Sequence, residues 1–328
     1  MKKVNWGVLG TAGIAKGQTI PGMMQAENCT LYAIAGRSLE KAKAYQAEFG
    51  FLNVYDSYDA LLADPNVEAV YIPLPNELHY EWTMKALKAK KHVLCEKPLA
   101  PKPYQIQQMF DCAKENGVLL MEAYAYLHSP LMASIKKEIQ SGAIGDVLYM
   151  ESQFITSDYD ISNIRMRKET FGGSTYDLGC YTTTQILWLL EEEPVKVQAV
   201  AEFSKEGIDT YTSGVLTFAD GKKATFICAM VLATDKDRRI DCLRIHGTKG
   251  DIYCGAQFNQ CGELSYRLTI GDQSVVKTVS TPHNYRLEVE QLGRCITDGE
   301  QPHVTEAFTM KNARVMESIL ALIGYGKI

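Results

Sequence analysis

Short apolar runs alternate with amphipathic segments along the first third of the chain. The apolar runs lie at 4–9, 30–35, 53–55, 69–72, 93–95 and 118–121. Helical periodicity marks the segments between them, at 14–24, 39–49, 58–63, 77–89 and 104–116. Ser38 and Asn76 are residue types that cap helices, and Gly50 and Gly117 are placed to end them. Apolar strands that alternate with helices predict a parallel sheet covered on both faces.

After about residue 123 the pattern changes to longer strands with alternating polarity. These strands are predicted at 147–155, 195–203, 212–218, 223–231, 242–246, 265–270 and 275–279. Helices are predicted at 131–140, 182–190, 284–297 and 305–324. Turn sequences at 220–221 and 271–272 indicate mostly antiparallel pairing. The chain therefore reads as α/β: a parallel-sheet domain at 1–123, followed at 124–328 by an α+β domain with a large, mostly antiparallel open sheet.

Composition narrows the functional classes. Among 328 residues, 46% are hydrophobic and 22% are charged, with a net charge of −5 and no dense cluster of Lys and Arg, which argues against a nucleic-acid or anionic-membrane partner. No apolar run approaches membrane-spanning length. Nine cysteines are scattered without a Cys-x-x-Cys pair, which argues against a zinc site and a disulfide framework. We expect a cytoplasmic protein with no structural metal.

The first strand runs into a glycine-rich turn, GVLGTAGIA at 7–15. Backbone N–H groups and the dipole of the following helix can hold a pyrophosphate at such a turn. Ala12 stands at the second glycine position of the dinucleotide fingerprint, but the strand before and the helix after favour a Rossmann-type site over plain strand–helix packing. The candidate cofactor-binding residues here are Gly10, Thr11, Ala12, Gly13 and Ile14.

The second strand ends in Arg37 and Ser38, with no acidic residue to bind a ribose 2′-hydroxyl. Arg and Ser suit the 2′-phosphate of NADP, so NADP(H) is favoured and NAD(H) stays an alternative. A structural interpretation is also open: Ser38 caps the next helix and Arg37 is solvated. Both interpretations of Ser38 can hold together.

Two further segments end strands of the parallel sheet, VYIPLPNELH at 70–79 and HVLCEKPLA at 92–100. Ligands of open parallel sheets bind at the carboxyl ends of the strands, so both segments lie on the edge that carries the glycine-rich turn. Pro98 restricts Lys97 to an extended conformation at the strand end. A lone histidine at a helix start is more often a surface residue than a site residue, but the position of His79 on this edge makes the odds about even. The candidates on this edge are Leu74, Pro75, Asn76, His79, Glu96 and Lys97.

A third segment, GGSTYDLGCY at 172–181, precedes an apolar helix. If the helix begins near Tyr176, Asp177 and Tyr181 are four residues apart and share one face, where a carboxylate and a phenol can meet substrate hydroxyls. The structural alternative is a glycine-rich loop, a cap and an aromatic core residue.

Taken in order, the Rossmann-like start, PNxxH, EKP and GGxxxDxGxY strongly resemble the Gfo/Idh/MocA oxidoreductase family over nearly the whole chain. The resemblance implies that Lys97 is catalytic, with a Lys97–Pro98 bond that is commonly cis. Asp177 and Tyr181 match the family's Asp and its His or Tyr. Tyrosine there is similar to the branch of glucose–fructose oxidoreductase, xylose dehydrogenase and dihydrodiol dehydrogenase, as is the 163–166 segment, which implies a cofactor contact by Arg165.

Departures from that branch leave the substrate open. Leu127 occupies a position where many members have Arg, and the His–Pro pairing is shifted to His128 and Pro130. The resemblance therefore implies the chemistry more closely than the particular sugar or diol.

The implied reaction is hydride transfer between nicotinamide and a carbinol or carbonyl carbon of a sugar or cyclic diol. Tyr181 would be the general acid/base, with the Lys97 ammonium stabilising a phenolate whose ordinary pKa is about 10, or Lys97 would donate the proton itself. Asp177 would orient a neighbouring hydroxyl.

A non-catalytic NAD(P)-sensing regulator of the same fold is the alternative function, and the intact set of Lys97, Asp177 and Tyr181 argues against it. The resemblance assigns dinucleotide binding to 1–123. It assigns substrate binding and oligomerisation, as a homodimer or homotetramer through the open sheet, to 124–328.

Overall fold

The computed structural model describes residues 2–157, 159–232 and 238–326. The chain divides into two compact units. The first comprises Met1–His128 and Pro282–Thr309, and the second Ser129–Thr281 and Met310–Ile328.

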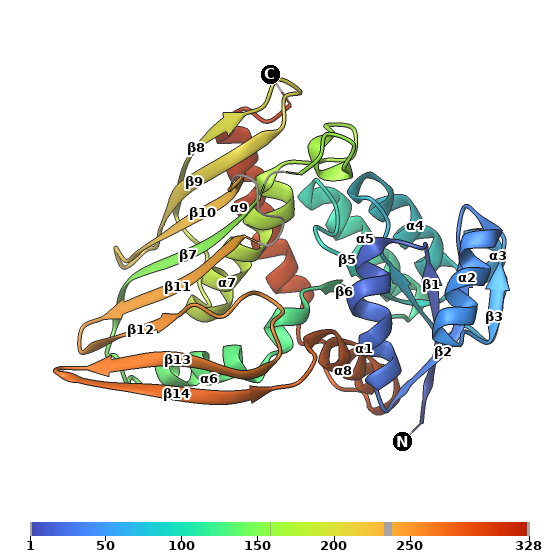
Figure 1. Cartoon of the computed structure of the whole chain (residues 1–328), viewed down its shortest axis with the longest axis horizontal. Helices are drawn as coiled ribbons and strands as arrows, with labels where there is room; N and C mark the ends of the chain where they lie inside the picture. Colours follow the sequence, from blue (N-terminus) through green and yellow to red (C-terminus); the bar gives the residue numbers. More distant parts are fainter. Residues whose placement is uncertain (1, 158, 233–237, 327–328) are drawn as a thin grey trace. The chain divides into compact units, whose positions relative to one another are not determined.

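The first unit is built on a parallel sheet, six-stranded over the described residues, with the order β3-β2-β1-β4-β5-β6 (Figure 1). Its strands are β1 (Val4–Leu9), β2 (Cys29–Ala35), β3 (Asn53–Tyr55), β4 (Ala69–Ile72), β5 (His92–Glu96) and β6 (Leu120–Ala123). All residues of β4 and β6 are buried, which confirms the prediction of a sheet covered on both faces. The strand order reverses between β1 and β4, so the carboxyl ends of these strands border the crevice where such folds bind ligands.

Helices connect these strands. They are the π-helix η1 (Ala15–Thr19), α1 (Ile20–Gln25), α2 (Leu39–Phe49), α3 (Tyr58–Ala63), α4 (Asn76–Lys88), α5 (Pro103–Asn116) and the 3-10 helix η2 (Ala125–His128). As predicted, Ser38 caps α2, and Gly50 and Gly117 end α2 and α5 in the left-handed conformation. Asn76 is not a cap, because Pro75 already has the extended ψ of 149° that the cap position requires.

The second unit contains a sheet that is eight-stranded over the described ranges, with the order β14-β13-β12-β11-β7-β10-β9-β8. Its strands are β7 (Val147–Ser157), β8 (Lys196–Phe203), β9 (Asp209–Thr217), β10 (Lys223–Leu232), β11 (Arg239–Gly247), β12 (Gly250–Cys254), β13 (Gly262–Ile270) and β14 (Gln273–Thr281). The pairing is antiparallel except between β7 and β10, which run parallel. This confirms the prediction of a mostly antiparallel sheet.

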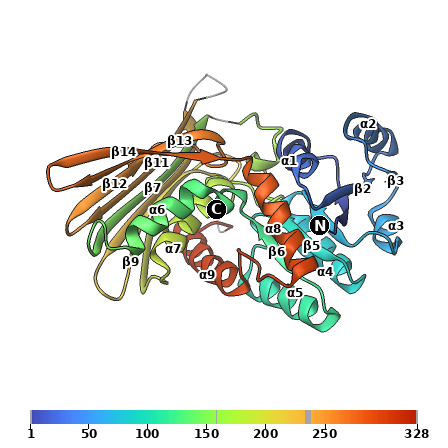
Figure 2. The same ribbon diagram turned by 90° about the horizontal axis from the view of Figure 1, so that it is seen from below.

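One face of this sheet is covered by helices (Figure 2). α6 (Pro130–Gln140) packs on β13 and β14, and α7 (Cys180–Leu190) packs on β7 and β10. α9 (Glu306–Ile323) is joined to α7 by the Thr183 hydroxyl, which donates to Asn312 at 2.7 Å. The 3-10 helix η3 (Ile164–Met166) and the π-helix η4 (Thr175–Gly179) precede α7.

The structure differs from the sequence-based division in two segments, 124–128 and 282–309, which both belong to the first unit. Residues 282–309 pack with the first unit, because α8 (Asn284–Asp298) lies against α1, β1 and β2. The Asn28 side chain also donates to the Glu290 carbonyl at 2.8 Å. β12 was not predicted from the sequence, since its glycine and aspartate resemble a turn and only Ile252 and Cys254 are buried.

Candidate active site

The glycine loop (residues 10–14) follows β1 at the carboxyl edge of the parallel sheet. Gly10 has φ of 125°, its N–H donates to the Ala35 carbonyl at 2.8 Å, and an added Cβ would lie 3.1 Å from the Leu74 side chain. At Gly13 an added Cβ would meet nothing within 4 Å, and helical backbone begins there. The Tyr45 hydroxyl donates to the Thr11 carbonyl at 3.2 Å. The loop thus presents a helix start to open space, which fits a pyrophosphate.

Ala12 and Ile14 of the loop are partly exposed. The methyl group of Ala12 therefore does not sit in the core.

Arg37 and Ser38 lie directly after β2 and are exposed. The Ser38 hydroxyl accepts the Lys41 N–H at 3.3 Å, so its capping role is confirmed. Burial raises the pKa of Tyr58, and the nearby Arg37 cation opposes that rise. The Tyr58 hydroxyl would lie 3.7 Å from a Cβ at Gly10, so a basic group, a phenol and the glycine loop share one edge. This arrangement fits an additional phosphate on the cofactor.

The lysine turn (residues 96–99) follows β5. Its Lys97–Pro98 peptide bond is cis, as the resemblance implied. The Leu99 N–H donates to the Glu122 carboxylate at 2.9 Å, and the Pro98 carbonyl lies 2.8 Å from Nδ1 of His79. The backbone that follows Lys97 is therefore bound by side chains from two different elements.

His79 has a different position from the one predicted. Its ring is fully buried, and Nε2 lies 2.7 Å from the Leu74 carbonyl. Both ring nitrogens thus face backbone carbonyls, which leaves neither to bind a cofactor. Burial lowers the pKa of His79 and the Lys97 ammonium lowers it further, against the effect of the two carbonyls. Pro75 and Asn76, in contrast, are partly exposed on the edge.

Glu96 ends a buried chain of hydroxyl groups. The Thr19 hydroxyl donates to Tyr71 at 2.8 Å, and the Tyr71 hydroxyl donates to Glu96 at 2.6 Å. Burial, then the Glu96 charge, raises the pKa of Tyr71 well above its usual value. Glu288 of α8 is fully buried, and burial together with Glu96 raises its pKa well above the usual range. Glu96, the first residue of the lysine turn, is thus linked by hydrogen bonds to Tyr71 and through it to Thr19, and its charge acts on the buried Glu288.

The sequence did not assign roles to Tyr71, Glu122 and Glu288. Tyr71 was visible only as one residue of an apolar strand, and Glu122 as one acid at the end of another. Glu288 and Glu96 are more than 180 residues apart in the sequence, so no local pattern connects the two.

In the second unit, the Asp177 segment (residues 172–181) is held by Asp209 at the start of β9. The Ser174 hydroxyl, the Thr175 N–H and the Thr175 hydroxyl each donate to Oδ2 of Asp209 at 2.7 Å, and the Thr212 hydroxyl donates at 2.9 Å. Burial raises the pKa of Asp209, and these hydrogen bonds oppose the rise. The start of the segment is therefore fixed by one carboxylate oxygen.

The first two glycines of the segment are required by close approach. A Cβ at Gly172 would lie 2.3 Å from the Arg165 carbonyl, and one at Gly173 would lie 2.0 Å from the Asp209 carboxylate. Gly173 also has φ of 109°, which favours glycine.

Asp177 forms an ion pair with Arg165, whose Nε donates to it at 2.6 Å. The Asp177 charge raises the pKa of Arg165. The structure brings Arg165 to the predicted catalytic aspartate, and the cofactor contact expected of Arg165 stays a prediction. The π-helical turn η4 also contains Asp177, so the simple α-helical spacing from Asp177 to Tyr181 does not apply.

Tyr181 lies in the first turn of α7 and is partly exposed. Its ring packs edge-on against Phe154 with centroids 5.5 Å apart, and against Phe258 at 5.3 Å. Phe154 and Phe258 stack at 5.1 Å, and the Arg239 guanidinium lies 4.2 Å over the Phe154 ring. These contacts hold the phenol ring in one orientation.

Over the described residues, no three His, Cys, Asp or Glu side chains are grouped to hold a metal ion. No described helix combines the length and the apolar character that a membrane crossing needs.

Comparison with known proteins gives consistent matches along the chain. Residues 4–124 match the family model described as "Oxidoreductase family, NAD-binding Rossmann fold", and residues 132–253 match the "GFO/IDH/MocA C-terminal domain".

Two of the curated relatives illustrate matches over nearly the whole length. The chain is 34% identical over 318 residues to a D-xylose 1-dehydrogenase (NADP(+)) of Haloferax volcanii, covering 96% of this chain and 95% of the relative. It is 37% identical over 317 residues to the dTDP-3,4-didehydro-2,6-dideoxy-alpha-D-glucose 3-reductase of Actinomadura kijaniata, covering 95% and 93%. Among solved structures, the aldose-aldose oxidoreductase of Caulobacter crescentus complexed with glycerol has a TM-score of 0.90 at 26% identity, covering 99% and 98%.

Proposed function

Because the chain belongs to the Gfo/Idh/MocA oxidoreductase family, we propose that it transfers a hydride between a nicotinamide dinucleotide and a carbinol or carbonyl carbon of a sugar or cyclic diol. The observation that carries this proposal is that the three motif residues proposed as catalytic are all present on segments held by buried carboxylates: Lys97 on the lysine turn, and Asp177 and Tyr181 on the Asp177 segment. A regulator that only senses the cofactor has no need of all three.

A sugar is the favoured substrate class. The two curated relatives named above act, by their names, on D-xylose and on a dTDP-linked deoxysugar. The Arg165–Asp177 pair and the Tyr181 phenol offer charged and neutral hydrogen-bonding groups of the kind that bind vicinal hydroxyls. The cytoplasmic location stays a prediction.

NADP(H) is the favoured cofactor, and the nicotinamide supplies or accepts the hydride when bound. The glycine loop would hold the pyrophosphate, and Arg37 with Ser38 would hold the 2′-phosphate. Titration with NADPH and NADH, followed by nicotinamide fluorescence, separates the cases. Tighter NADPH binding that weakens in Arg37→Ala supports the assignment, whereas equal binding of both cofactors would contradict it.

Tyr181 is the proposed general acid/base, since it has a partly exposed phenol on a fixed ring. Lys97 either stabilises the phenolate or exchanges the proton itself. Asp177, held by Arg165, orients a substrate hydroxyl. These assignments follow the family's motif residue by residue.

The test is steady-state turnover with NADP+ and a panel of aldoses and cyclic diols. Lys97→Met and Tyr181→Phe should each abolish turnover while the Kd for NADPH stays within a few-fold. Lys88→Met, a change of an exposed lysine at the end of α4, is the matched control and should be fully active. Unchanged turnover in Lys97→Met would overturn the catalytic assignment. Tight NADPH binding without turnover of any substrate would favour the regulator.

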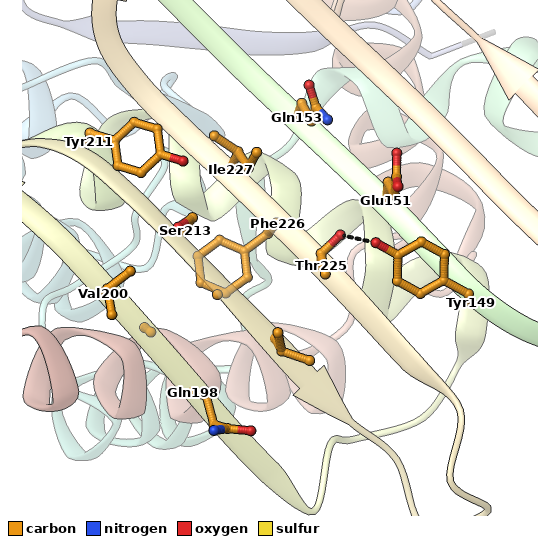
Figure 3. Close-up of a pocket in the computed structure, with 13 residues that line it drawn as sticks. Tyr149, Glu151, Gln153, Gln198, Val200, Tyr211, Ser213, Thr225, Phe226 and Ile227 are labelled. Atoms are coloured by element: carbon orange, nitrogen blue, oxygen red, sulfur yellow. Dashed lines mark hydrogen bonds between the residues drawn. The ribbon is translucent and has the colours of Figure 1, made fainter.

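We also propose a homodimer or homotetramer formed through the open face of the second unit's sheet. Strands β7, β8, β9 and β10 border a hollow of about 440 Å³ on the sheet, and Figure 3 shows Tyr149, Val200, Tyr211 and Ile227 among its lining residues. Val200, in the middle of β8, is 67% exposed and borders this hollow together with Tyr211 and Ile227, so the exposed apolar side chains here are grouped rather than scattered.

Sedimentation velocity tests this surface. Val200→Glu should shift the protein toward monomer, whereas Leu52→Glu, at an apolar residue that is 62% exposed in the first unit, should not. A wild-type protein that stays monomeric at micromolar concentration would contradict the proposal.

A further inference from the structure

The peptide segment that follows Lys97 is bound from both sides by buried titratable side chains. The Pro98 carbonyl faces Nδ1 of His79 at 2.8 Å, and the Leu99 N–H donates to Oε1 of Glu122 at 2.9 Å. His79 is 0% exposed and Glu122 is 2% exposed. Neither side chain can reach solvent or a ligand, so their role lies in what they hold.

His79 links two loops of the cofactor edge. It stands in the first turn of α4, and its Nε2 lies 2.7 Å from the Leu74 carbonyl while Nδ1 faces Pro98. Leu74 in turn lies against Gly10, since a Cβ there would come within 3.1 Å of it. With its pKa lowered, the ring is neutral at pH 7 and donates its one N–H to one of the two carbonyls. The ring nevertheless lies between the lysine turn and the loop that borders the glycine loop and contacts both.

Glu122 fixes the same turn from the neighbouring strand. It lies in β6, opposite Cys95 of β5 in the parallel register, one residue before the lysine turn begins. Burial raises the pKa of Glu122 to about 7, and the Lys97 ammonium is among the groups that oppose the rise. The carboxyl group thus feels the lysine's charge while it holds the backbone two residues beyond it.

We propose that His79 and Glu122 are positioning residues that aim the Lys97 ammonium by holding the peptide after it on both sides. This inference rests on the catalytic role of Lys97 given under the proposed function. Loss of either contact leaves the strand and helix in place but frees the turn, so the reaction should slow while cofactor binding persists. A misplacement of about 1 Å can cost about 100-fold in rate.

The experiment compares an ablating and a conservative variant at each position. Glu122→Ala removes the acceptor for the Leu99 N–H, whereas Glu122→Gln keeps an amide oxygen there. His79→Leu removes both contacts, whereas His79→Gln keeps one. We expect kcat to fall about 10–100-fold in the ablating variants, about tenfold in His79→Gln and less than about threefold in Glu122→Gln, with KM and the Kd for NADPH within about threefold throughout.

His92→Leu is the matched control. His92 lies at the opposite end of the same strand β5, where its Nδ1 accepts the Leu119 N–H at 3.0 Å. The control removes one contact between a histidine and the backbone, so it should lower Tm without changing kcat. If kcat follows Tm across all five variants, the roles are merely structural and the inference is wrong.

Lys97→Met distinguishes a failure of the proposed function of Lys97 from a failure of the positioning inference. If it retains turnover, the proposed function of Lys97 fails. If it is inactive while folded Glu122→Ala and His79→Leu variants keep the wild-type kcat, only the positioning inference fails. Should the ablating variants not fold, the two glutamine variants decide: wild-type kcat in His79→Gln would overturn the inference for His79, and a loss beyond tenfold in Glu122→Gln would overturn it for Glu122.

Discussion

The lysine turn and the Asp177 segment are both held by a buried carboxylate, but in opposite ways. In the first unit, Glu122 accepts one backbone N–H, and a second side chain, His79, completes the contact from another element. In the second unit, one oxygen of Asp209 accepts four donors from three residues. Two elements hold the lysine turn, whereas one carboxylate oxygen holds the start of the Asp177 segment.

This difference predicts whether a substitution in each unit affects the reaction rate or the stability first. A turn held by two separate residues can lose one and remain folded, so its failure should be seen in the rate of reaction. The Asp177 segment gathers four donors on one buried oxygen, so loss of that oxygen leaves several buried donors without their acceptor and should be seen first in stability. The predictions below test that contrast, from the largest effect to the smallest.

Asp209→Ala should lower the free energy of unfolding by about 3–5 kcal/mol, because it leaves several buried donors without an acceptor. Denaturant unfolding measures the effect. Asp220→Ala is the control, because the Asp220 side chain is 57% exposed on a turn of the same unit, and it should cost less than about 1 kcal/mol. A loss below about 1 kcal/mol in Asp209→Ala would show that the segment has support elsewhere.

Gly173→Ala should cost about 2–4 kcal/mol, because the residue combines φ of 109° with a Cβ position 2.0 Å from Asp209. Gly221→Ala separates the two causes, since Gly221 has φ of 90° but no atom within 4 Å of the added Cβ. It should cost only about 1 kcal/mol. Equal losses in both variants would mean that the close approach to Asp209 carries no energy.

Glu122 should make the first unit less stable as pH rises. Burial raises its pKa from 4.5 to about 7 in the folded protein, so the folded state binds the proton more tightly than the unfolded state. The resulting decrease in the free energy of unfolding is absent below pH 4.5 and reaches about 2 kcal/mol by pH 6. Glu122→Gln, which resembles the neutral acid, should flatten this slope. Parallel stability curves for the two proteins between pH 4.5 and 7 would contradict the prediction.

Thr212→Val should cost only about 1 kcal/mol, because it removes one of the donors to Asp209 and leaves the others in place. Measured beside Asp209→Ala, it tells whether the four hydrogen bonds contribute separately or as a unit. A loss as large as that of Asp209→Ala would indicate that they act as a unit.

The first unit could be predicted closely from the sequence because its strands are continuous apolar runs and its helices have caps and terminal glycines. The position of α8 could not, because an amphipathic helix such as 284–298 shows that it packs but not on what. Residues that belong to a motif could also be predicted more readily than residues that support them. Lys97 and Tyr181 were predicted from motifs, whereas Asp209 was not, since it stands at the start of a strand predicted to begin at 212 and its donors come from a distant segment.

His79 and Arg165 show that a motif does not predict which groups its side chains contact. The place of His79 on a ligand-binding edge suggested contact with a cofactor, but both of its ring nitrogens face backbone carbonyls. The motif that contains Arg165 did not indicate its ion pair with Asp177. A motif identifies that a polar residue is required but not which atoms it binds, because that depends on which loops the fold brings within about 3 Å.

The parallel pair at the centre of the second sheet has a consequence for how the protein forms. β7 and β10 pair Tyr149 with Lys223, and a parallel pairing needs a crossover rather than a hairpin. The chain between them contains the Asp177 segment, α7, β8 and β9. The central pairing is thus a contact of high sequence separation, whose loop must close before it contributes. We expect the sheet's middle to form late in folding and together with the segment that carries Asp177 and Tyr181, so that a chain with a completed sheet already has this part of its chemistry assembled.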